Sequence, residues 1–275
     1  MPSKDIDPTG IAPDHGETAR QSAPAAACPE GIDLTSNVTL TDSTLTDSTL
    51  TDVGLAPSGK GQVLLIACGA LAREILALKA ANGWTHLDLT CLPAILHNHP
   101  DHIVPAVRAA VNQHRARYNT VFVVYADCGT GGGLQAACAE LGVQMIAGPH
   151  CYAFLEGTAG FVRRTKDEFT AFYLTDFLVR QFDAFVWRPL GLDRHPALRD
   201  TYFAHYTKLV YQAQTDDPAL TALAQSHARR LSLPFEMRFT GYGDLATALS
   251  DLSLSDGYRS GAAHHGSFLP EIPRG

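Results

Sequence analysis

Apolar and polar stretches alternate along the middle of the chain in the order expected for strands and helices. Four short runs of consecutive apolar residues suit buried strands, and between them apolar residues recur at the spacing of an amphipathic helix. Continuous apolar strands separated by helices predict a mostly parallel sheet with helices on both faces. The expected strands are residues 63–67, 85–90, 121–126 and 143–147, and the expected helices are 70–81, one that begins near Pro100, and 133–141.

The second half of the chain is expected to be mostly helical. The spacing of its aromatic and aliphatic residues predicts helices over 171–186 and 198–214. Asp217 and Pro218 are a favourable N-cap and first-turn pair for a further helix. That helix is expected to end near Leu231, and it is followed by a half-exposed edge strand over 235–239 and a last helix that begins near Asp244.

Two pairs of cysteines repeat with the same internal spacing of 23 residues, from 68 to 91 and from 128 to 151. Each pair opens with a Cys-Gly dipeptide just after an apolar run. The repeat predicts a three-layer α/β domain built from a duplicated strand–helix–strand unit and completed by the helical C-terminal half. Because ligands of parallel sheets bind outside the carboxyl ends of the strands, that edge is the expected functional site. The residues expected there are Cys68, Cys91, Cys128 and Cys151.

Composition divides the chain into three segments. Residues 1–60 are rich in Ser, Thr, Asp, Pro and Gly, and a five-residue polar repeat begins at Leu40, so we expect a disordered tail. Residues 61–255 are expected to form a single α/β domain, because about 195 residues suffice for one core. Residues 256–275 are expected to be a flexible C-terminal tail.

Charge and hydropathy exclude several classes of partner. The net charge is −7 and no basic patch alternates with aromatic residues, which argues against nucleic acid. The first residues lack the apolar segment of a secretory signal, and the longest apolar run is far too short to span a membrane. We therefore expect a soluble cytoplasmic protein, in which six cysteines favour metal ligands, reactive thiols or core packing over disulfides.

The four strand-end cysteines are candidate metal ligands. Thiolates at neighbouring strand ends, with His97 and His150 close in sequence, could hold a tetrahedral zinc ion or an iron–sulfur cluster. The chain has no Cys-x-x-Cys pair, so the fold would have to assemble the site. Two other interpretations stay open: a metal-free reactive thiol, and cysteines that merely pack as small apolar side chains.

His97, His150 and Asp127 are the candidate acid–base groups, and the two histidines are equally candidate ligands. His97 precedes an expected helix N-terminus, which disfavours a charged imidazole and suits a neutral ligand. Further acids near strand ends could act as a general base or orient a histidine, although a structural role is the expectation for each. They are Asp88, Asp176 and Glu74.

A glycine-rich turn follows the third expected strand and consists of Gly129, Thr130, Gly131 and Gly132. Its backbone N–H groups could bind an anion or let a cofactor approach the backbone closely. Leu134 stands where the dinucleotide-binding fingerprint requires a third glycine, so that motif is excluded.

Several short motifs extend over about residues 61–252 and carry a resemblance to a known family. They are Ala67-Cys68-Gly69-Ala70, Cys91-Leu92-Pro93, Leu96-His97-Asn98, Asp127-Cys128-Gly129-Thr130-Gly131-Gly132, Gly148-Pro149-His150-Cys151-Tyr152, Leu174-Thr175-Asp176-Phe177-Leu178 and, later, Tyr206, Tyr211 and Gln214-Thr215-Asp216-Asp217-Pro218. Together they resemble the family catalogued as domain of unknown function 1638. Members of that family tend to be encoded among corrinoid-dependent methyltransferase systems, so the resemblance implies a link to methyl transfer or corrinoid reactivation.

The leading hypothesis is a metal-binding protein that acts in corrinoid-linked methyl transfer or corrinoid reactivation. A zinc-bound thiolate suits the former and a low-potential iron–sulfur cluster the latter, so the metal, and whether the chain is a metal-dependent methyltransferase or a redox accessory, stay open. The implied partner is a corrinoid protein or a methyltransferase component. The alternatives are a metal-free accessory or chaperone that docks on such a partner, and a small-molecule transferase whose glycine-rich turn binds an anion.

Overall fold

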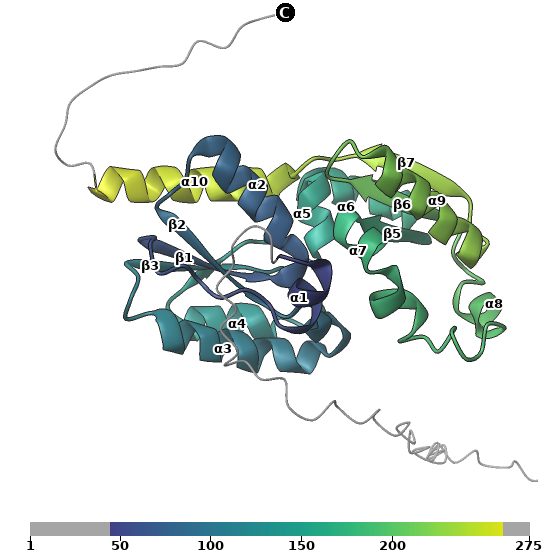
Figure 1. The fold of residues 1–275 in the computed structure, drawn as a ribbon, viewed down its shortest axis with the longest axis horizontal. Coiled ribbons are helices and arrows are strands. Elements are labelled where there is room, and N and C mark those ends of the chain that lie inside the picture. The colour runs from purple at the N-terminus through teal and green to yellow at the C-terminus, as the bar shows by residue number, and fades with distance from the viewer. Residues whose placement is uncertain (1–44, 261–275) are drawn as a thin grey trace, which may run out of the picture. The chain divides into compact units, whose positions relative to one another are not determined.

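The computed structural model describes residues 45–260, apart from the side chains of residues 165–167 and 256–260, and contains two parallel sheets (Figure 1). The first sheet has the strand order β2-β1-β3-β4 and the second has the order β5-β6-β7. The strands are β1 (Val63–Cys68), β2 (Leu87–Leu92), β3 (Thr120–Val124), β4 (Gln144–Met145), β5 (Ala171–Thr175), β6 (Lys208–Ala213) and β7 (Phe235–Phe239).

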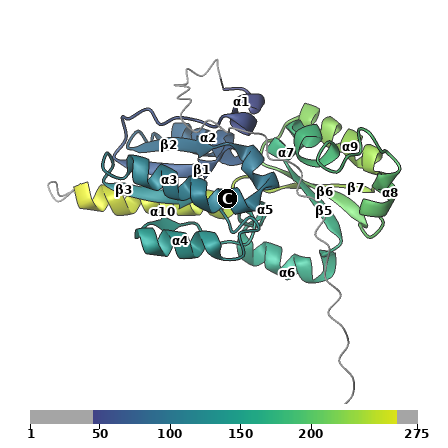
Figure 2. The ribbon, with the colours of Figure 1, turned by 90° about the horizontal axis from the view of Figure 1, so that it is seen from below.

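Helices cover both faces of the first sheet, which confirms the predicted α/β class. In Figure 1, α2 and α10 lie on one face and α3 and α4 on the other, and Figure 2 views the molecule from the side of α3 and α4. The chain passes twice through a strand–helix–strand unit, first β1–α2–β2 and then β3–α4–β4. The helices are α2 (Ala72–Asn82), α3 (Ile103–His114), α4 (Gly133–Leu141) and α10 (Gly243–Ser260), with 3-10 helices at Gly69–Leu71, Ala94–Asn98 and Pro100–His102.

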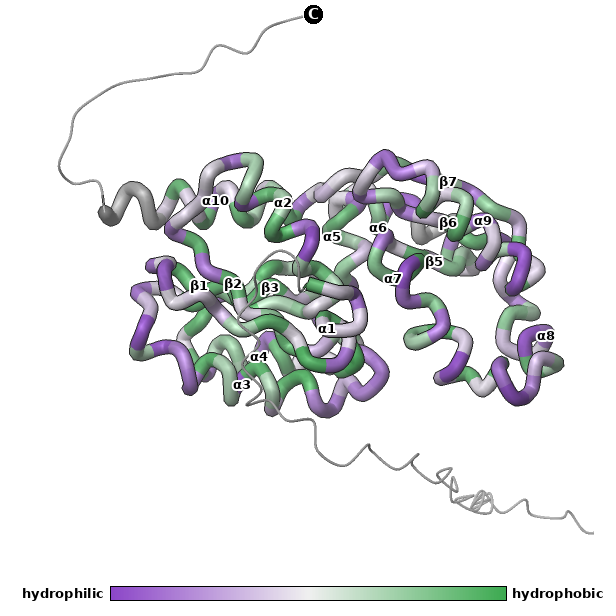
Figure 3. Tube along the Cα trace, in the orientation of Figure 1, coloured by the Kyte–Doolittle hydropathy of each residue, from purple (hydrophilic) through white to green (hydrophobic). Residues whose placement is uncertain are grey.

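The central strand β1 explains why the first sheet follows the sequence pattern so closely. All five residues from Val63 to Ala67 are fully buried, because β1 pairs with β2 on one side and β3 on the other. The apolar colouring of Figure 3 gathers on these strands, whereas the segment around α8 (Leu198–Tyr202) is hydrophilic. A strand buried on both faces and both edges requires a continuous apolar run, and this is the pattern that the sequence shows.

Two helices predicted for the second half are wrong over part of their length. Residues 171–175 and 208–213 form the strands β5 and β6. Within the expected helices, the helical parts are α7 (Asp176–Arg180), a π-helical turn (Asp183–Trp187) and α8. Residues 209–213 are all fully buried, so β6 is a central strand covered on both faces. Pairing of β6 with strands on both sides outweighs the local helical spacing.

The remaining elements of the second half begin and end close to their predicted positions. Helix α9 (Pro218–Leu231) starts at Pro218, and the Asp217 carboxylate caps it by accepting from the N–H groups of Ala219 at 2.8 Å and Leu220 at 3.3 Å. Strand β7 is an edge strand, as predicted, and α10 starts one residue before Asp244. No helix within residues 45–260 combines the length and the apolar character needed to cross a membrane.

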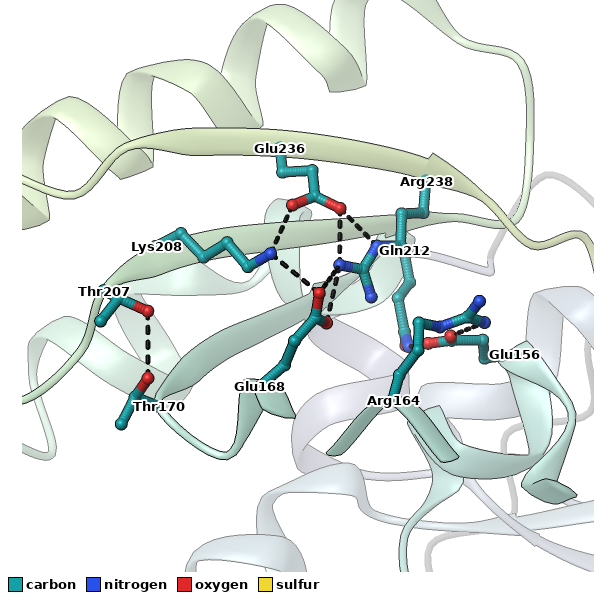
Figure 4. Close-up of polar contacts among 9 residues, drawn as sticks. All are labelled: Glu156, Arg164, Glu168, Thr170, Thr207, Lys208, Gln212, Glu236 and Arg238. Atoms are coloured by element: carbon teal, nitrogen blue, oxygen red, sulfur yellow. Dashed lines mark hydrogen bonds and ion pairs between the residues drawn. The ribbon is translucent and has the colours of Figure 1, made fainter. Parts of the chain in front are cut away.

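The second sheet packs one face against α7 and α9 and carries charged side chains on the other (Figure 4). The Glu168 carboxylate, at the end of α6 (Thr158–Glu168), accepts two hydrogen bonds from Arg238 at 2.8 and 2.9 Å and one from Lys208 at 3.0 Å. Glu236 accepts from the same two cations at 2.5 and 2.6 Å. Two acids and two bases therefore neutralise each other across β6 and β7.

Residues 45–60, which we expected to belong to a disordered tail, are part of the folded chain. They include α1 (Asp47–Asp52), which Thr46 caps by accepting from the Thr49 N–H at 3.1 Å, and Leu50 is fully buried. Leu55 exchanges two backbone hydrogen bonds of 2.8 Å with Cys91 in β2. The folded region thus begins by residue 45, while residues 1–44 and 261–275 lie outside the described residues.

Asp88 in β2 holds this added segment against the sheet. Its buried carboxylate accepts from Ser58 N–H and Oγ at 3.0 Å, from Gly59 N–H at 2.7 Å and from the Tyr118 hydroxyl at 2.8 Å. Burial acts to raise the pKa of Asp88, but these donors outweigh it and the pKa lies below the ordinary value. Asp88 lies near the amino end of β2, whereas Cys91 lies near the carboxyl end, where the candidate site residues are. The role of Asp88 is therefore structural.

Replacing Asp88 with Asn should destabilise the fold by about 1–2 kcal/mol near neutral pH, because charge-assisted hydrogen bonds to a buried carboxylate are lost. Since the folded-state pKa is depressed, the stabilisation is present above the unfolded pKa of about 4 and is lost as pH falls through the folded pKa. Urea unfolding from pH 7 to pH 3 measures the effect. The difference between wild type and D88N should shrink below about pH 4, whereas the exposed control Asp251→Asn should show little difference at any pH.

Candidate functional site

The carboxyl edge of the first sheet carries all four cysteines of the repeat. Cys68 is the last residue of β1, Cys91 lies near the end of β2, Cys128 follows β3, and Cys151 is the first residue of α5 (Cys151–Glu156). Topology alone therefore places the four where the sequence predicts them. Their side chains do not all reach one point, however.

A small cavity of about 40 Å³ lies at this edge and is lined by three of the four sulfurs, those of Cys68, Cys128 and Cys151. The imidazole of His97 and the ring of Tyr125 line it as well. The other residues on its lining are mostly apolar, and four lining residues belong to β5, α7 and the π-helical turn. These four are Thr175, Phe177, Leu178 and Phe185.

Cys91 does not line this cavity. It is buried within the sheet, its backbone pairs with Leu55, and its thiol interacts with the thiol of Cys68 and with Glu74 and Lys79 of α2. Burial raises the pKa of the Cys91 thiol well above its ordinary value. Cys91 therefore lies off the cavity lining, although its thiol stays near that of Cys68.

Cys128 is the centre of the side-chain contacts in the cavity. Its thiol interacts with the thiol of Cys151 and with the imidazole of His97. The neighbouring Cys151 and burial raise the pKa of Cys128 far above its ordinary value, although His97 acts in the opposite direction. Cys128 is therefore a neutral thiol.

Two backbone hydrogen bonds bring Cys128 and Cys151 together. The N–H of Asp127 donates to Gly148 O at 3.1 Å and that of Cys128 donates to Pro149 O at 3.3 Å. Cys128 then adopts φ = +48°, a left-handed conformation that costs a residue with a Cβ about 1–2 kcal/mol. Such strain away from glycine is concentrated at functional sites, and here it turns the Cys128 thiol toward the cavity.

The glycine-rich turn uses its own N–H groups internally. The Asp127 carboxylate accepts from Gly132 N–H at 2.7 Å, from Gly131 N–H at 3.2 Å and from the Thr130 hydroxyl at 2.9 Å. The pKa of Asp127 is lowered, and the hydrogen bond from Gly132 is the main cause. The donors expected to bind an anion are already occupied, as is the carboxylate expected to act as a base.

His150 lies beside the cavity rather than on its lining. Its ring stacks on Tyr152, with the ring centroids 4.9 Å apart, and Tyr152 stacks in turn on Tyr173 at 5.6 Å. Burial lowers the pKa of His150, and the neighbouring His97 lowers it further. His150 is thus a neutral imidazole in an aromatic stack, and of the two predicted histidines His97 is the one that lines the cavity.

Tyr125 is a site residue that the sequence did not reveal. Its hydroxyl is completely buried and interacts with the thiols of Cys68, Cys91 and Cys128. Burial raises the pKa of Cys68 to about 12, so Cys68 also stays protonated. A tyrosine at the end of an apolar run looks like a core residue, and the sequence pattern does not show that its hydroxyl lies among cysteines.

The other candidate acids have separate roles. Asp176, at the end of β5, accepts from the Tyr211 hydroxyl at 2.7 Å, from Gln214 N–H at 3.0 Å and from the Thr215 hydroxyl at 2.5 Å, so it joins β5 to β6. Glu74 is buried with one carboxylate oxygen unpartnered, and burial raises its pKa to about 7 while Arg180 opposes the shift. Neither acid lines the cavity.

The donor set fits a soft metal ion in its chemistry, since three thiols and an imidazole line one small cavity. The arrangement is not that of a finished site. Within residues 45–260, no group of three or more His, Cys, Asp and Glu side chains is placed so that it could hold a metal ion. Side chains would have to turn toward a common centre on binding.

Comparison with known proteins identifies the chain only at the level of a family. A family model described as "Protein of unknown function (DUF1638)" matches residues 91–249. No curated protein and no solved structure matches the chain.

The strain at residue 128 can be measured by comparing two variants that both lack the thiol. Cys128→Gly should be more stable than Cys128→Ala by about 0.5–1 kcal/mol, because glycine adopts positive φ freely but gains entropy in the unfolded chain. Denaturant unfolding gives both values. The control Ala126→Gly, at a buried position without positive φ, should be destabilising, and equal stability of the two residue-128 variants would contradict the strain.

Proposed function

Because the chain belongs to the DUF1638 family, whose description assigns no activity, we propose a function from the site itself. The protein binds one soft metal ion, such as Zn²⁺, in the cavity and serves corrinoid-linked methyl transfer. The observation that carries the proposal is that Cys68, His97, Cys128 and Cys151 line one small cavity. Sulfur and imidazole are the ligands that zinc prefers.

A single ion is favoured over an iron–sulfur cluster by ligand number. Clusters are commonly held by four thiolates, and three cysteines of the described residues line the cavity.

Burial explains why a metal would matter at this site. In its absence Cys68 and Cys128 are protonated, because burial raises the pKa of both thiols. Zinc binds the thiolate form and releases the proton, so a bound ion would supply a thiolate at neutral pH. A metal-free reactive thiolate at Cys128 is correspondingly disfavoured.

Each side chain would have its own role at such a site. Cys128, Cys151 and His97 would be ligands, and Cys68 is a further cysteine on the lining. Tyr125 contributes a buried hydroxyl that can donate to an oxygen or sulfur of a bound group. The link to corrinoid-dependent methyl transfer rests on the family resemblance, and its chemical support is that thiolate chemistry of this kind suits transfer of a methyl group.

The anion-binding alternative has less support than the metal site. Gly131 and Gly132 donate their N–H groups to Asp127, so no free donor set remains in this turn for a phosphate. The docking alternative makes no demand on the cavity, and it is the role that remains if the protein binds no metal.

Metal content of protein purified without oxygen tests the proposal. Wild type should contain about one zinc per chain and show no visible absorption band. Cys128→Ser should weaken zinc binding by more than the roughly 10–100-fold that accompanies loss of an outer-shell partner. The matched control is Cys138→Ser, which also replaces a buried cysteine, but one in α4 that does not line the cavity, and it should retain the metal.

Two results would overturn this assignment. Iron with sulfide and a visible band would replace the single ion by a cluster and favour corrinoid reactivation. Wild type without metal, even after reconstitution with zinc, would leave the docking role.

A further inference from the structure

We propose that the protein forms a symmetric dimer in which β7 pairs antiparallel with β7 of a second copy. β7 is the outer strand of the second sheet, and within residues 45–260 it pairs with β6 alone (Figure 1). A strand with a neighbour on one side presents backbone N–H and C=O groups to a partner on the other. No residue of β7 lines the cavity, so the inference is independent of the proposed metal.

The hydrogen bonds between β6 and β7 show which backbone groups face away from β6. Leu209 N–H donates to Pro234 O at 2.8 Å. Thr240 N–H donates to Ala213 O at 2.9 Å, so residues 234 and 240 both face β6. Because the backbone groups of successive strand residues point to alternate sides, every second residue between these two faces outward. The outward-facing residues are Phe235, Met237 and Phe239.

Two of these outward-facing residues also have exposed apolar side chains. Met237 is 38% exposed and Phe239 is 65% exposed. Both lie on the α9 face of the sheet, because the Thr221 hydroxyl of α9 donates to Met237 Sδ at 3.7 Å and alternate strand residues share a face. Glu236 and Arg238 lie on the other face, in the charged cluster of Figure 4. An apolar edge of this kind indicates a partner, since monomeric proteins usually protect their edge strands.

The sequence of β7 complements itself when two copies run in opposite directions. Its five residues are Phe-Glu-Met-Arg-Phe. A two-fold axis at Met237 places Glu236 opposite Arg238 of the second copy, and Phe235 opposite Phe239 of that copy. Opposite charges and aromatic pairs directly across an antiparallel ladder stabilise the pairing. A two-fold axis uses the same strand of both copies, which is the commonest symmetry of protein dimers.

The backbone and the charges favour the same register. With the axis at Met237, outward-facing residues lie opposite outward-facing residues, so 235, 237 and 239 form hydrogen-bonded pairs with the second copy. Glu236 and Arg238 then occupy the non-hydrogen-bonded positions, where side chains across the ladder come closest. A shift of the register by two residues keeps the hydrogen bonds but places Glu236 opposite Glu236, or Arg238 opposite Arg238. Repulsion between like charges therefore selects one register.

Molar mass measured by light scattering during size-exclusion chromatography tests the dimer. Full-length wild type should reach twice the 29.5 kDa of one chain as its concentration rises. Met237→Pro should keep the mass of one chain, because it removes an outward-facing N–H and obstructs the ladder. An edge strand tolerates proline where the N–H faces outward, so this variant should keep its fold, which circular dichroism checks.

A matched pair of aromatic substitutions distinguishes the edge from exposed apolar surface in general. Phe239→Ser should raise the Kd of the dimer about tenfold, because two aromatic pairs across the ladder are lost. Phe169→Ser should leave the Kd unchanged. Phe169 is 81% exposed, but it precedes β5, which is the opposite edge of the sheet.

Charge reversal tests the register. Glu236→Arg and Arg238→Glu each place like charges opposite each other in a dimer of identical chains, so each variant alone should have the mass of one chain. A mixture of the two should regain the mass of a dimer, because each variant then supplies the charge that the other lacks.

Three results would overturn the proposal. Wild type that keeps the mass of one chain at every concentration would leave the edge to a partner of another kind. A dimer that Met237→Pro leaves intact would place the interface elsewhere. Folded charge variants that remain at the mass of one chain when they are mixed would exclude pairing about Met237.

Discussion

Two backbone hydrogen bonds, from Asp127 to Gly148 and from Cys128 to Pro149, extend the pairing of β3 and β4 beyond the last residues of the strands. β4 is only two residues long, so these bonds do much to set where the following segment lies. They place the segment that leads into Cys151 beside Cys128, which has a left-handed conformation, and both cysteines line the cavity. This part of the cavity lining therefore depends on them.

The fold of the first half follows from the sequence because its strands are buried on both faces. A continuous apolar run such as 63–67 predicts a strand buried on both faces when such runs alternate with amphipathic helices along the chain. The second half was harder to predict, because the aromatic and aliphatic residues that form β5 and β6 also recur at helical spacing. Strand partners that are distant in the sequence decide between strand and helix, and a local pattern carries no information about them.

The site shows the same division between local and long-range information. Spacing of Cys68, Cys91, Cys128 and Cys151 placed all four at one edge of the sheet, since topology fixes where strands end. It could not show that Cys91 stays inside β2 or that Asp127 occupies the N–H groups of the glycine-rich turn, because both depend on side-chain direction. Pairing of Leu55 with Cys91 likewise joins positions 36 residues apart, which no local repeat announces.

The cavity has one wall from the first sheet and another from the segment that follows β5. Since cysteines of the first wall and residues such as Phe177 and Leu178 of the second line the same cavity, a group that fills it would touch both. Binding would therefore act as a clamp between the two sheets, and its free energy would add to the cost of separating them. The reverse also follows: a partner that pulls the β5–α7 segment away would uncover the thiols and weaken their hold on the bound group.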